Sequence, residues 1–278
     1  MPSMKAIKRR IATVRNTQQI MKAMNLVAAS KLQKNKTKLE AITPLFDSSK
    51  EFLKQGVKNQ AALENEYYQI RPVENTAFVV LSGERGLCGS FNTNVQKEAL
   101  SHMNGKNEHI VAVGAKGYEF FVRRNKNIAA EYQGVLENVS YESAAEIADH
   151  IIKMYNEGLV DEVYIVHTDF INILSQNPRI TKLLPLEIPE DASDEEVIYE
   201  PDIQTYLKKS VPIYLAMFLY GTMVESSVCE QASRMTSMDS ATRNAGEIVD
   251  NLTLQYNRQR QGAITQEISE IVGGANVL

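Results

Sequence analysis

The chain has 278 residues, of which 44% are hydrophobic and 23% are charged, and its net charge is −4. These values are ordinary for a soluble protein of one large domain or two modest ones. No run of about 18 apolar residues is present, so we expect no transmembrane helix, and the N-terminus has no apolar segment typical of a signal peptide. Cys88 and Cys229 are far apart and form no CxxC pair, which favours a reducing compartment over a disulfide framework or a zinc knuckle.

Basic residues are concentrated at the start of the chain. Residues 1–60 contain 13 Lys and Arg against 3 Asp and Glu, and no acidic residue precedes Glu40. Residues 61–205 have the opposite balance, with 11 basic and 24 acidic residues. A field this one-sided favours an acidic partner, which leaves nucleic acid, anionic lipid and an acidic protein loop open. A solvated charged face without a partner is the plainer interpretation.

Both ends of the chain predict long helices. Residues 1–60 and 206–278 are poor in helix breakers, and each contains mostly apolar residues that recur about every 3.5 positions. This repeat is typical of a left-handed coiled coil, so we predict that the two segments form an antiparallel helix pair. Ordinary packed helices of an α-rich domain are the alternative. The first stripe consists of Met4, Ile7, Ile11, Val14, Gln18, Met21, Asn25, Ala28, Leu32, Asn35, Leu39 and Ile42, and the second of Val224, Val228, Met235, Met238, Ala245, Val249, Leu252 and Tyr256.

Residues 70–190 are predicted to form a different domain, inserted between the two helices. Short apolar runs alternate there with helical stretches, which indicates a mainly parallel sheet with helices on its faces. The acidic stretch 187–202 that follows is expected to be an exposed loop. Strands are expected at 77–82, 110–114, 128–132, 163–167 and 180–186, and helices at 93–103, 118–124 and 143–157.

The turn Ser82–Asn92 is the one stretch that suggests ligand chemistry. A glycine-rich turn between a strand and a helix can direct backbone N–H groups at a phosphate. The spacing here is GxxGxxG, not GxGxxG, and no Gly-Lys-Ser/Thr follows. A tight structural turn is therefore the preferred interpretation. The four histidines show no metal-ligand spacing within a helix turn, and GxSxG and HExxH are absent, so we expect no catalytic, cofactor-binding or metal-binding residues.

Three blocks of the sequence resemble one family from end to end of the chain. The first is IATVRNTQQI at 11–20 with KAMNLVAASKL at 22–32, and the second is RGLCGSFN within the turn Ser82–Asn92. The third is ASRMTSMDSATRNA at 232–245 with RQGAITQEISEIVGGA at 260–275. The chain is thereby identified as resembling the gamma subunits of F-type ATP synthases.

The resemblance implies a fold and a role. The fold is α/β plus a long antiparallel α-helical coiled coil, with a Rossmann-like domain between the terminal helices. The role is that of a rotor, without catalysis or a cofactor, inside a ring of three alpha and three beta subunits. The epsilon subunit and the membrane c ring would meet the α/β domain, and ion flow would turn the assembly. The chain would be a peripheral protein on the cytoplasmic face of the bacterial membrane, with no direct membrane insertion and no nucleic acid bound.

The resemblance also implies which residues contact the surrounding ring. Met24 would face an acidic loop of a beta subunit, together with the basic residues Lys22 and Lys31. Two further sets lie near the C-terminus: polar contacts from Arg260, Gln261, Thr265 and Glu267, and an apolar tip formed by Ile264, Ile268, Ile271 and Val272.

Two other functions compete with this interpretation. A basic coiled coil that binds nucleic acid would explain the charge of residues 1–60, although Phe46 and Phe52 are the only Phe, Tyr or Trp side chains there that could stack on bases. A free-standing α/β enzyme would use the turn from Gly83 to Gly89 to hold a phosphate ligand. Nucleotide binding by the middle segment would favour that enzyme.

Overall fold

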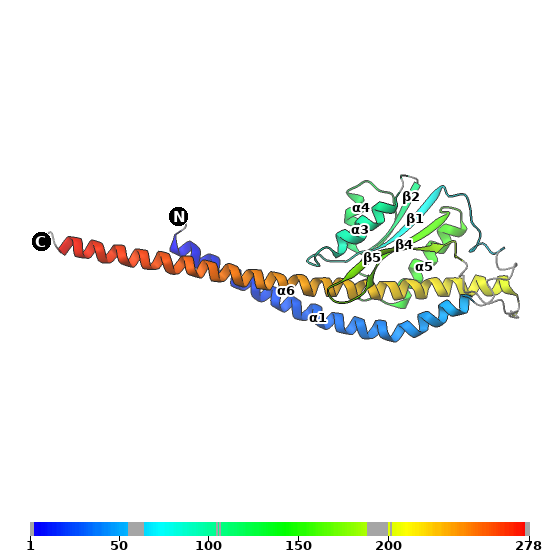
Figure 1. Cartoon of the computed structure of the whole chain (residues 1–278). Coiled ribbons are helices and arrows are strands. Elements are labelled where there is room, and N and C mark those ends of the chain that lie inside the picture. The colour runs from blue at the N-terminus through cyan, green and yellow to red at the C-terminus, as the bar shows by residue number, and fades with distance from the viewer. Residues whose placement is uncertain are drawn as a thin grey trace. The chain divides into compact units, whose positions relative to one another are not determined.

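The computed structural model describes residues 3–54, 64–103, 105, 107–187, 200 and 202–275. The chain divides into two compact units, one of Met1–Ala28 with Met235–Leu278 and the other of Ala29–Arg234. The helices α1 (Met4–Lys54) and α6 (Ile203–Ala275) each contribute to both units (Figure 1). The predicted helical ends are thus confirmed, while residues 55–60 and most of the predicted loop 187–202 lie outside the described residues.

The unit Ala29–Arg234 contains the predicted α/β sheet. Its described strands are β1 (Asn75–Leu81), β2 (Asn107–Val113), β3 (Ile128–Tyr132), β4 (Glu162–Phe170) and β5 (Gln176–Leu184), in the order β3-β2-β1-β4-β5. β1 pairs in parallel with β2 and β4, and β2 pairs in parallel with β3. β4 and β5 form an antiparallel hairpin. The prediction of a mainly parallel sheet is confirmed.

The two faces of the sheet are covered by different helices (Figure 1). Alternate strand residues such as Val79 and Ile165 point to α5 (Tyr141–Asn156) and to the first part of α6, in one buried cluster. Phe78 and Val80 point the other way, to α3 (Phe91–His102) and α4 (Ala115–Val122). Because side chains alternate along a strand, the nearly continuous apolar runs of β1 and β2 supply both cores.

The ends of several elements differ from the prediction, for identifiable reasons. β4 is longer than the expected strand at 163–167, and β5 begins four residues before the expected start at 180, because backbone pairing in the hairpin extends as far as Phe170 with Gln176. Pairing of this kind leaves no hydrophobic signal in a polar edge strand. α6 begins at Ile203, three residues before the prediction, and the Asp202 carboxylate caps it by accepting a hydrogen bond from the Thr205 N–H (2.8 Å).

In the unit Met1–Ala28 with Met235–Leu278, α1 and α6 pack as an antiparallel pair. The predicted stripe is on the inside: Ile7 and Ala28 are 3% and 1% exposed, and Ala245 and Leu252 of α6 are 5% and 7% exposed. Met4, at the very start, is the one exposed member of either stripe. The coiled-coil prediction is confirmed.

The polar members of the α1 stripe have partners on α6. The side-chain amide of Gln18 donates to the Thr242 carbonyl (3.1 Å), and that of Asn25 donates to the Met235 carbonyl (2.9 Å). In the unit Ala29–Arg234, the Asn35 amide donates in the same way to the Ser227 hydroxyl (2.8 Å). Each amide therefore marks one position of the antiparallel register.

α6 is the one helix of the described residues that is long and apolar enough to cross a membrane by length and composition, with a mean hydropathy of 1.3 over its most apolar window. However, 56% of that window is buried inside the protein. Leu215, Leu219 and Met223 are 0–1% exposed in the core against the sheet. This packing accounts for the hydrophobicity of the helix.

Candidate functional site

The C-terminal part of α6 has no partner helix among the described residues of its unit. The register set by Gln18 with Thr242 and by Asn25 with Met235 places Met4, the first residue of α1, near Tyr256. α6 continues beyond that level to Ala275, as Figure 1 shows. Every residue from 260 to 272 is exposed except Ala263, which is half-buried.

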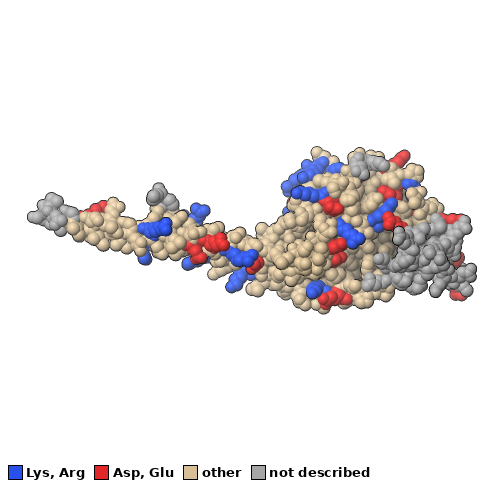
Figure 2. Space-filling view, in the orientation of Figure 1, with Lys and Arg blue, Asp and Glu red and all other residues tan. Residues whose placement is uncertain are grey.

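An apolar stripe runs along this unpaired segment. Ile264, Ile268, Ile271 and Val272 are 47%, 55%, 71% and 55% exposed. Their spacing of four, three and one residues places them on one face of the helix. A contiguous exposed apolar stripe on an isolated helix marks a surface for a partner. We name these four residues the tip stripe, and in Figure 2 the surface of this part of α6 is mostly uncharged.

Polar groups with no internal partner flank the tip stripe. The side chains of Arg260, Gln261 and Glu267 are exposed, and none forms a hydrogen bond or ion pair within the described residues. The Thr265 hydroxyl is engaged, since it donates to the Gln261 carbonyl (2.9 Å) within the helix. Three of the four predicted polar contacts therefore offer free donors or acceptors beside an apolar face.

The structure does not bring the predicted residues of α1 together with the tip stripe. Lys22 is exposed and Met24 is half-buried, and both lie near Met238 in the register of the helix pair. At a rise of about 1.5 Å per residue, Arg260 lies roughly 33 Å further along α6. The predicted contacts therefore form two separate groups within this unit. Lys31 belongs to the other unit.

Lys31 lies beside a small cavity that was not predicted from the sequence. The cavity measures about 90 Å³ and is lined by Lys31, Lys34 and Lys38 from α1, and by Gln231 from α6. The Lys38 ammonium also donates to the Val139 carbonyl and lies 5.2 Å from the centre of the Tyr220 ring. The spacing of these lysines by three and four residues is a signal of one basic helix face, and it was available in the sequence.

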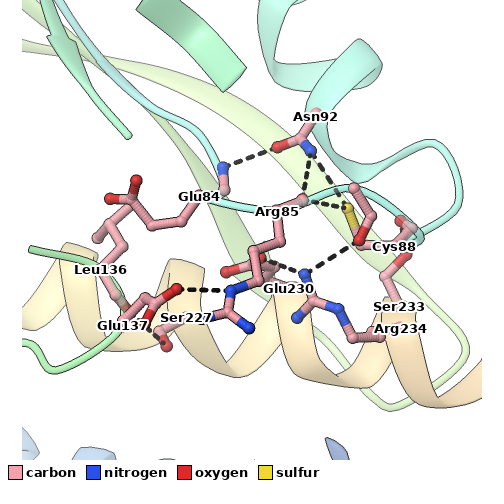
Figure 3. Close-up of polar contacts among 12 residues, drawn as sticks. Glu84, Arg85, Cys88, Asn92, Leu136, Glu137, Ser227, Glu230, Ser233 and Arg234 are labelled. Atoms are coloured by element: carbon pink, nitrogen blue, oxygen red, sulfur yellow. Dashed lines mark hydrogen bonds and ion pairs between the residues drawn. The ribbon is translucent and has the colours of Figure 1, made fainter. Parts of the chain in front are cut away.

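The glycine-rich turn is fastened to α6, as Figure 3 shows. The Ser233 hydroxyl donates to the Cys88 carbonyl (2.8 Å), and the Arg234 guanidinium donates to the Gly86 carbonyl (3.3 Å). Within the turn, the Asn92 carboxamide oxygen accepts from the Gly83 N–H (2.7 Å). A Cβ added at Gly83 would lie 2.7 Å from a carboxylate oxygen of Glu230, so a larger residue here would have to displace the Glu230 side chain, which is buried and ion-paired with Arg234.

Two carboxylates at this turn oppose phosphate binding. Glu230 forms a buried ion pair with Arg234 (2.6 Å), and burial raises the pKa of the Glu230 carboxyl in spite of that partner. The Glu84 carboxylate accepts hydrogen bonds from the N–H groups of Ala115 (3.0 Å) and Gly134 (2.8 Å), so it already occupies the N-terminal end of α4. The geometry therefore favours the structural interpretation of the turn over a nucleotide site.

Cys88 of the same turn is a buried free thiol. It packs with Phe91 and Cys229 in a small apolar cluster, and burial raises its pKa, with the Glu230 charge acting in the same direction. A thiol with a raised pKa is a poor nucleophile at neutral pH. The thiol thus contributes packing to the junction between the turn and α6.

Comparison with known proteins places the whole chain in one family. A family model described as ATP synthase matches residues 3–278. The ATP synthase gamma chain of Desulfitobacterium hafniense is 41% identical over 280 residues, which cover 100% of both chains. A chain of the Tetrahymena thermophila mitochondrial ATP synthase, from a structure of its central stalk and c-ring, is 25% identical with a TM-score of 0.64, and the match covers 80% of this chain and 99% of that one.

A chain of the Euglena gracilis mitochondrial ATP synthase shares the fold, with a TM-score of 0.74 at 18% identity, over 99% of this chain and 94% of that one. The relatives give no support to the nucleic-acid alternative. The full-length identity to curated gamma chains, taken with the antiparallel helix pair and the inserted sheet, shows that this chain belongs to the ATP synthase gamma-chain family.

Proposed function

We propose that this chain is the rotor of an F-type ATP synthase, which couples ion flow through a membrane c ring to the synthesis or hydrolysis of ATP in a ring of alpha and beta subunits. The observation that carries the proposal is the unpaired segment of α6, in which the tip stripe and three free polar side chains are exposed. Such a segment offers a surface to a surrounding partner, and in this family that partner would be the alpha–beta ring.

The two kinds of contact have different mechanical consequences. An apolar stripe in an apolar collar makes few directional bonds, so rotation there meets low barriers. Hydrogen bonds depend steeply on angle and distance, so Arg260 and Gln261 would favour particular orientations of the rotor. Basic side chains such as Lys22 and Lys31 act on acidic loops over several ångströms, and salt screens them.

The rotor itself would carry out no chemistry. The turn that most resembles a nucleotide site carries the Glu84 carboxylate at the N-terminal end of α4, where a phosphate would otherwise bind, and the Glu230 carboxylate of α6 lies beside it. Catalysis would belong to the alpha and beta subunits, which makes this chain a non-catalytic member of the complex. We place it on the cytoplasmic face of a bacterial membrane, bound through the epsilon subunit and the c ring and not inserted in the lipid.

The test uses the chain reconstituted with alpha and beta subunits. Arg260→Ala combined with Gln261→Ala removes one charged contact, worth about 1.5–3 kcal/mol, and one neutral contact, worth about 0.5–1.5 kcal/mol. We expect the ATPase rate to change on the order of tenfold and the dwell angles seen in single-molecule rotation to broaden.

The matched control is Gln255→Ala combined with Arg258→Ala, which removes the same two residue types from exposed positions preceding the tip. It should leave the rate and the dwell angles unchanged. If the Arg260 and Gln261 variant rotates and hydrolyses ATP as the wild type does, these residues set no preferred angle. If the chain fails to enter the complex at all, the rotor assignment itself fails.

A further inference from the structure

Three side chains that bear metal-binding atoms meet between β4 and α6, away from the residues discussed above. His167 and Asp169 come from β4, and Glu225 comes from α6. One ligand atom from each lies within 4.8 Å of the other two. His167 is only 4% exposed, whereas the two carboxylates are half-buried.

In each of the three side chains, one polar atom has a hydrogen-bond partner and the other polar atom has none within the described residues. The Asp169 Oδ2 accepts from the Arg179 guanidinium (3.2 Å), and the Glu225 Oε1 accepts from the Phe170 N–H (2.8 Å). The His167 Nε2 lies 3.2 Å from the Thr181 hydroxyl. The remaining oxygen of Glu225 has no hydrogen bond within the described residues, and His167 Nδ1 is fully buried without one.

The orphaned His167 Nδ1 faces a carboxylate. It lies 3.4 Å from the Asp169 Oδ1, without the alignment of a hydrogen bond. A buried polar atom without a partner costs about 1–3 kcal/mol, so such an atom calls for an explanation. A cation between the imidazole nitrogen and the carboxylate oxygens would supply that partner.

The distances suit a tetrahedral metal ion. Bonds of about 2.0–2.2 Å to nitrogen and oxygen place neighbouring donor atoms roughly 3.3 Å apart around zinc. The 3.4 Å between His167 Nδ1 and Asp169 Oδ1 is already close to this value, and a carboxylate oxygen of Glu225 lies within 4.8 Å of both atoms. The Thr181 hydroxyl, 3.2 Å from His167 Nε2, could accept a hydrogen bond from that nitrogen and so orient the ring with Nδ1 toward the ion.

We propose that His167, Asp169 and Glu225 form a binding site for a zinc-like divalent cation, with water as the fourth ligand. The bound ion would cross-link β4 to α6, the helix that also carries the tip stripe. One histidine and two carboxylates are a donor set that zinc accepts. The sequence does not indicate this site, because its ligands come from a strand and from a helix more than 50 residues later and no spacing within one helix turn connects them.

The experiment uses the purified full-length chain, stripped with a chelator and then dialysed against Zn²⁺. Elemental analysis should find one Zn²⁺ per wild-type chain, and Co²⁺ in its place should give the visible absorption of a tetrahedral site. His167→Gln and Asp169→Asn should each abolish this stoichiometric uptake. Thr181→Val removes only the outer contact and should weaken binding about 10–100-fold.

The matched control is His102→Gln, which removes a histidine that lies 3.8 Å from Glu98 on the surface. This variant should bind Zn²⁺ as the wild type does. Melting curves recorded with chelator present establish that each variant is folded. The proposal is overturned if the wild type takes up no stoichiometric Zn²⁺, or if uptake survives both His167→Gln and Asp169→Asn.

Discussion

At the scale of single residues, the chain contains two ion pairs of the same type on one helix in opposite surroundings. Glu230 and Arg234 are 5% and 10% exposed at 2.6 Å, whereas Asp239 and Arg243 are 60% and 70% exposed at 3.4 Å. Both pairs have a spacing of four residues on α6. The buried pair also holds the Gly86 carbonyl of the glycine-rich turn, so it stabilises a junction and not only a helix.

We predict that Arg234→Met destabilises the chain by about 3–5 kcal/mol at neutral pH, because it leaves the Glu230 carboxylate buried without a partner. Arg243→Met, the control, should cost no more than about 1 kcal/mol. Urea unfolding of both variants measures the difference. Equal effects of the two substitutions would show that burial does not decide the contribution of the pair.

The loss of stability caused by Arg234→Met is also expected to depend on pH. Burial raises the pKa of Glu230, so the folded state takes up this proton more readily than the unfolded state does. The stability associated with that proton is fully present below the ordinary pKa of a glutamate and is lost as pH rises through the raised value. The loss in free energy of unfolding caused by Arg234→Met should therefore become smaller as pH falls from neutral, and urea unfolding at several pH values measures it. A loss that does not change with pH would mean that the Glu230 carboxylate is solvated and not buried.

At the scale of elements, the amides of α1 define how the two long helices align. Gln18 and Asn25 are seven residues apart, and their acceptors Thr242 and Met235 are also seven residues apart. A buried polar residue in a coiled-coil stripe lowers stability but specifies register, because a slipped pairing leaves it without a partner. The sequence marked these residues only as exceptions to an apolar stripe, and their hydrogen bonds supply the reason for them.

We predict that Gln18→Leu combined with Asn25→Leu preserves or raises the melting temperature but permits a second register. Spin labels at Lys22 and Asp239, both exposed, report the register by pulsed electron paramagnetic resonance. A slip of one heptad shifts the labels by about 10 Å, so the double variant should show a broadened or second distance. Gln19→Leu, on the exposed face, is the control and should keep a single distance. A single distance in the double variant would assign the register to the apolar residues alone.

Predictability also differs among the elements. The 3.5-residue stripes and the strands β1 and β2 were predictable because burial imposes a periodic pattern on the sequence. The strands β4 and β5 were predicted too short, and their antiparallel pairing was not predicted, since the polar residues from Gln176 to Arg179 pair through their backbone. The exposed tip stripe was identified through the family resemblance, because an apolar face looks the same in sequence whether it is covered by this chain or by another.

At the scale of the whole molecule, α6 packs within the chain along most of its length and is exposed at its C-terminal end. The beginning of α6 is buried against the sheet, its middle part packs on α1, and its last turns expose isoleucines. Apolar residues in the first two regions stabilise the chain itself. Those in the last region are about half exposed or more and contribute little to the stability of the chain itself, so their effect on binding has to be measured in the complex.

We predict that Ile264→Gln combined with Ile268→Gln changes the stability of the isolated chain by less than about 0.5 kcal/mol, because both side chains are already in water. Burial of each isoleucine in a collar is worth about 1.5–3 kcal/mol, so the affinity for the alpha–beta ring should fall at least tenfold. Leu252→Gln, at a 7% exposed position, should instead destabilise the chain itself, and Leu254→Gln, at a 58% exposed position before the tip, should do neither. Urea unfolding of the chain and sedimentation of the mixed subunits separate these outcomes. Unchanged assembly of the isoleucine variant would mean that the ring does not bury the tip stripe, and the polar residues beside it would then have to hold the rotor alone.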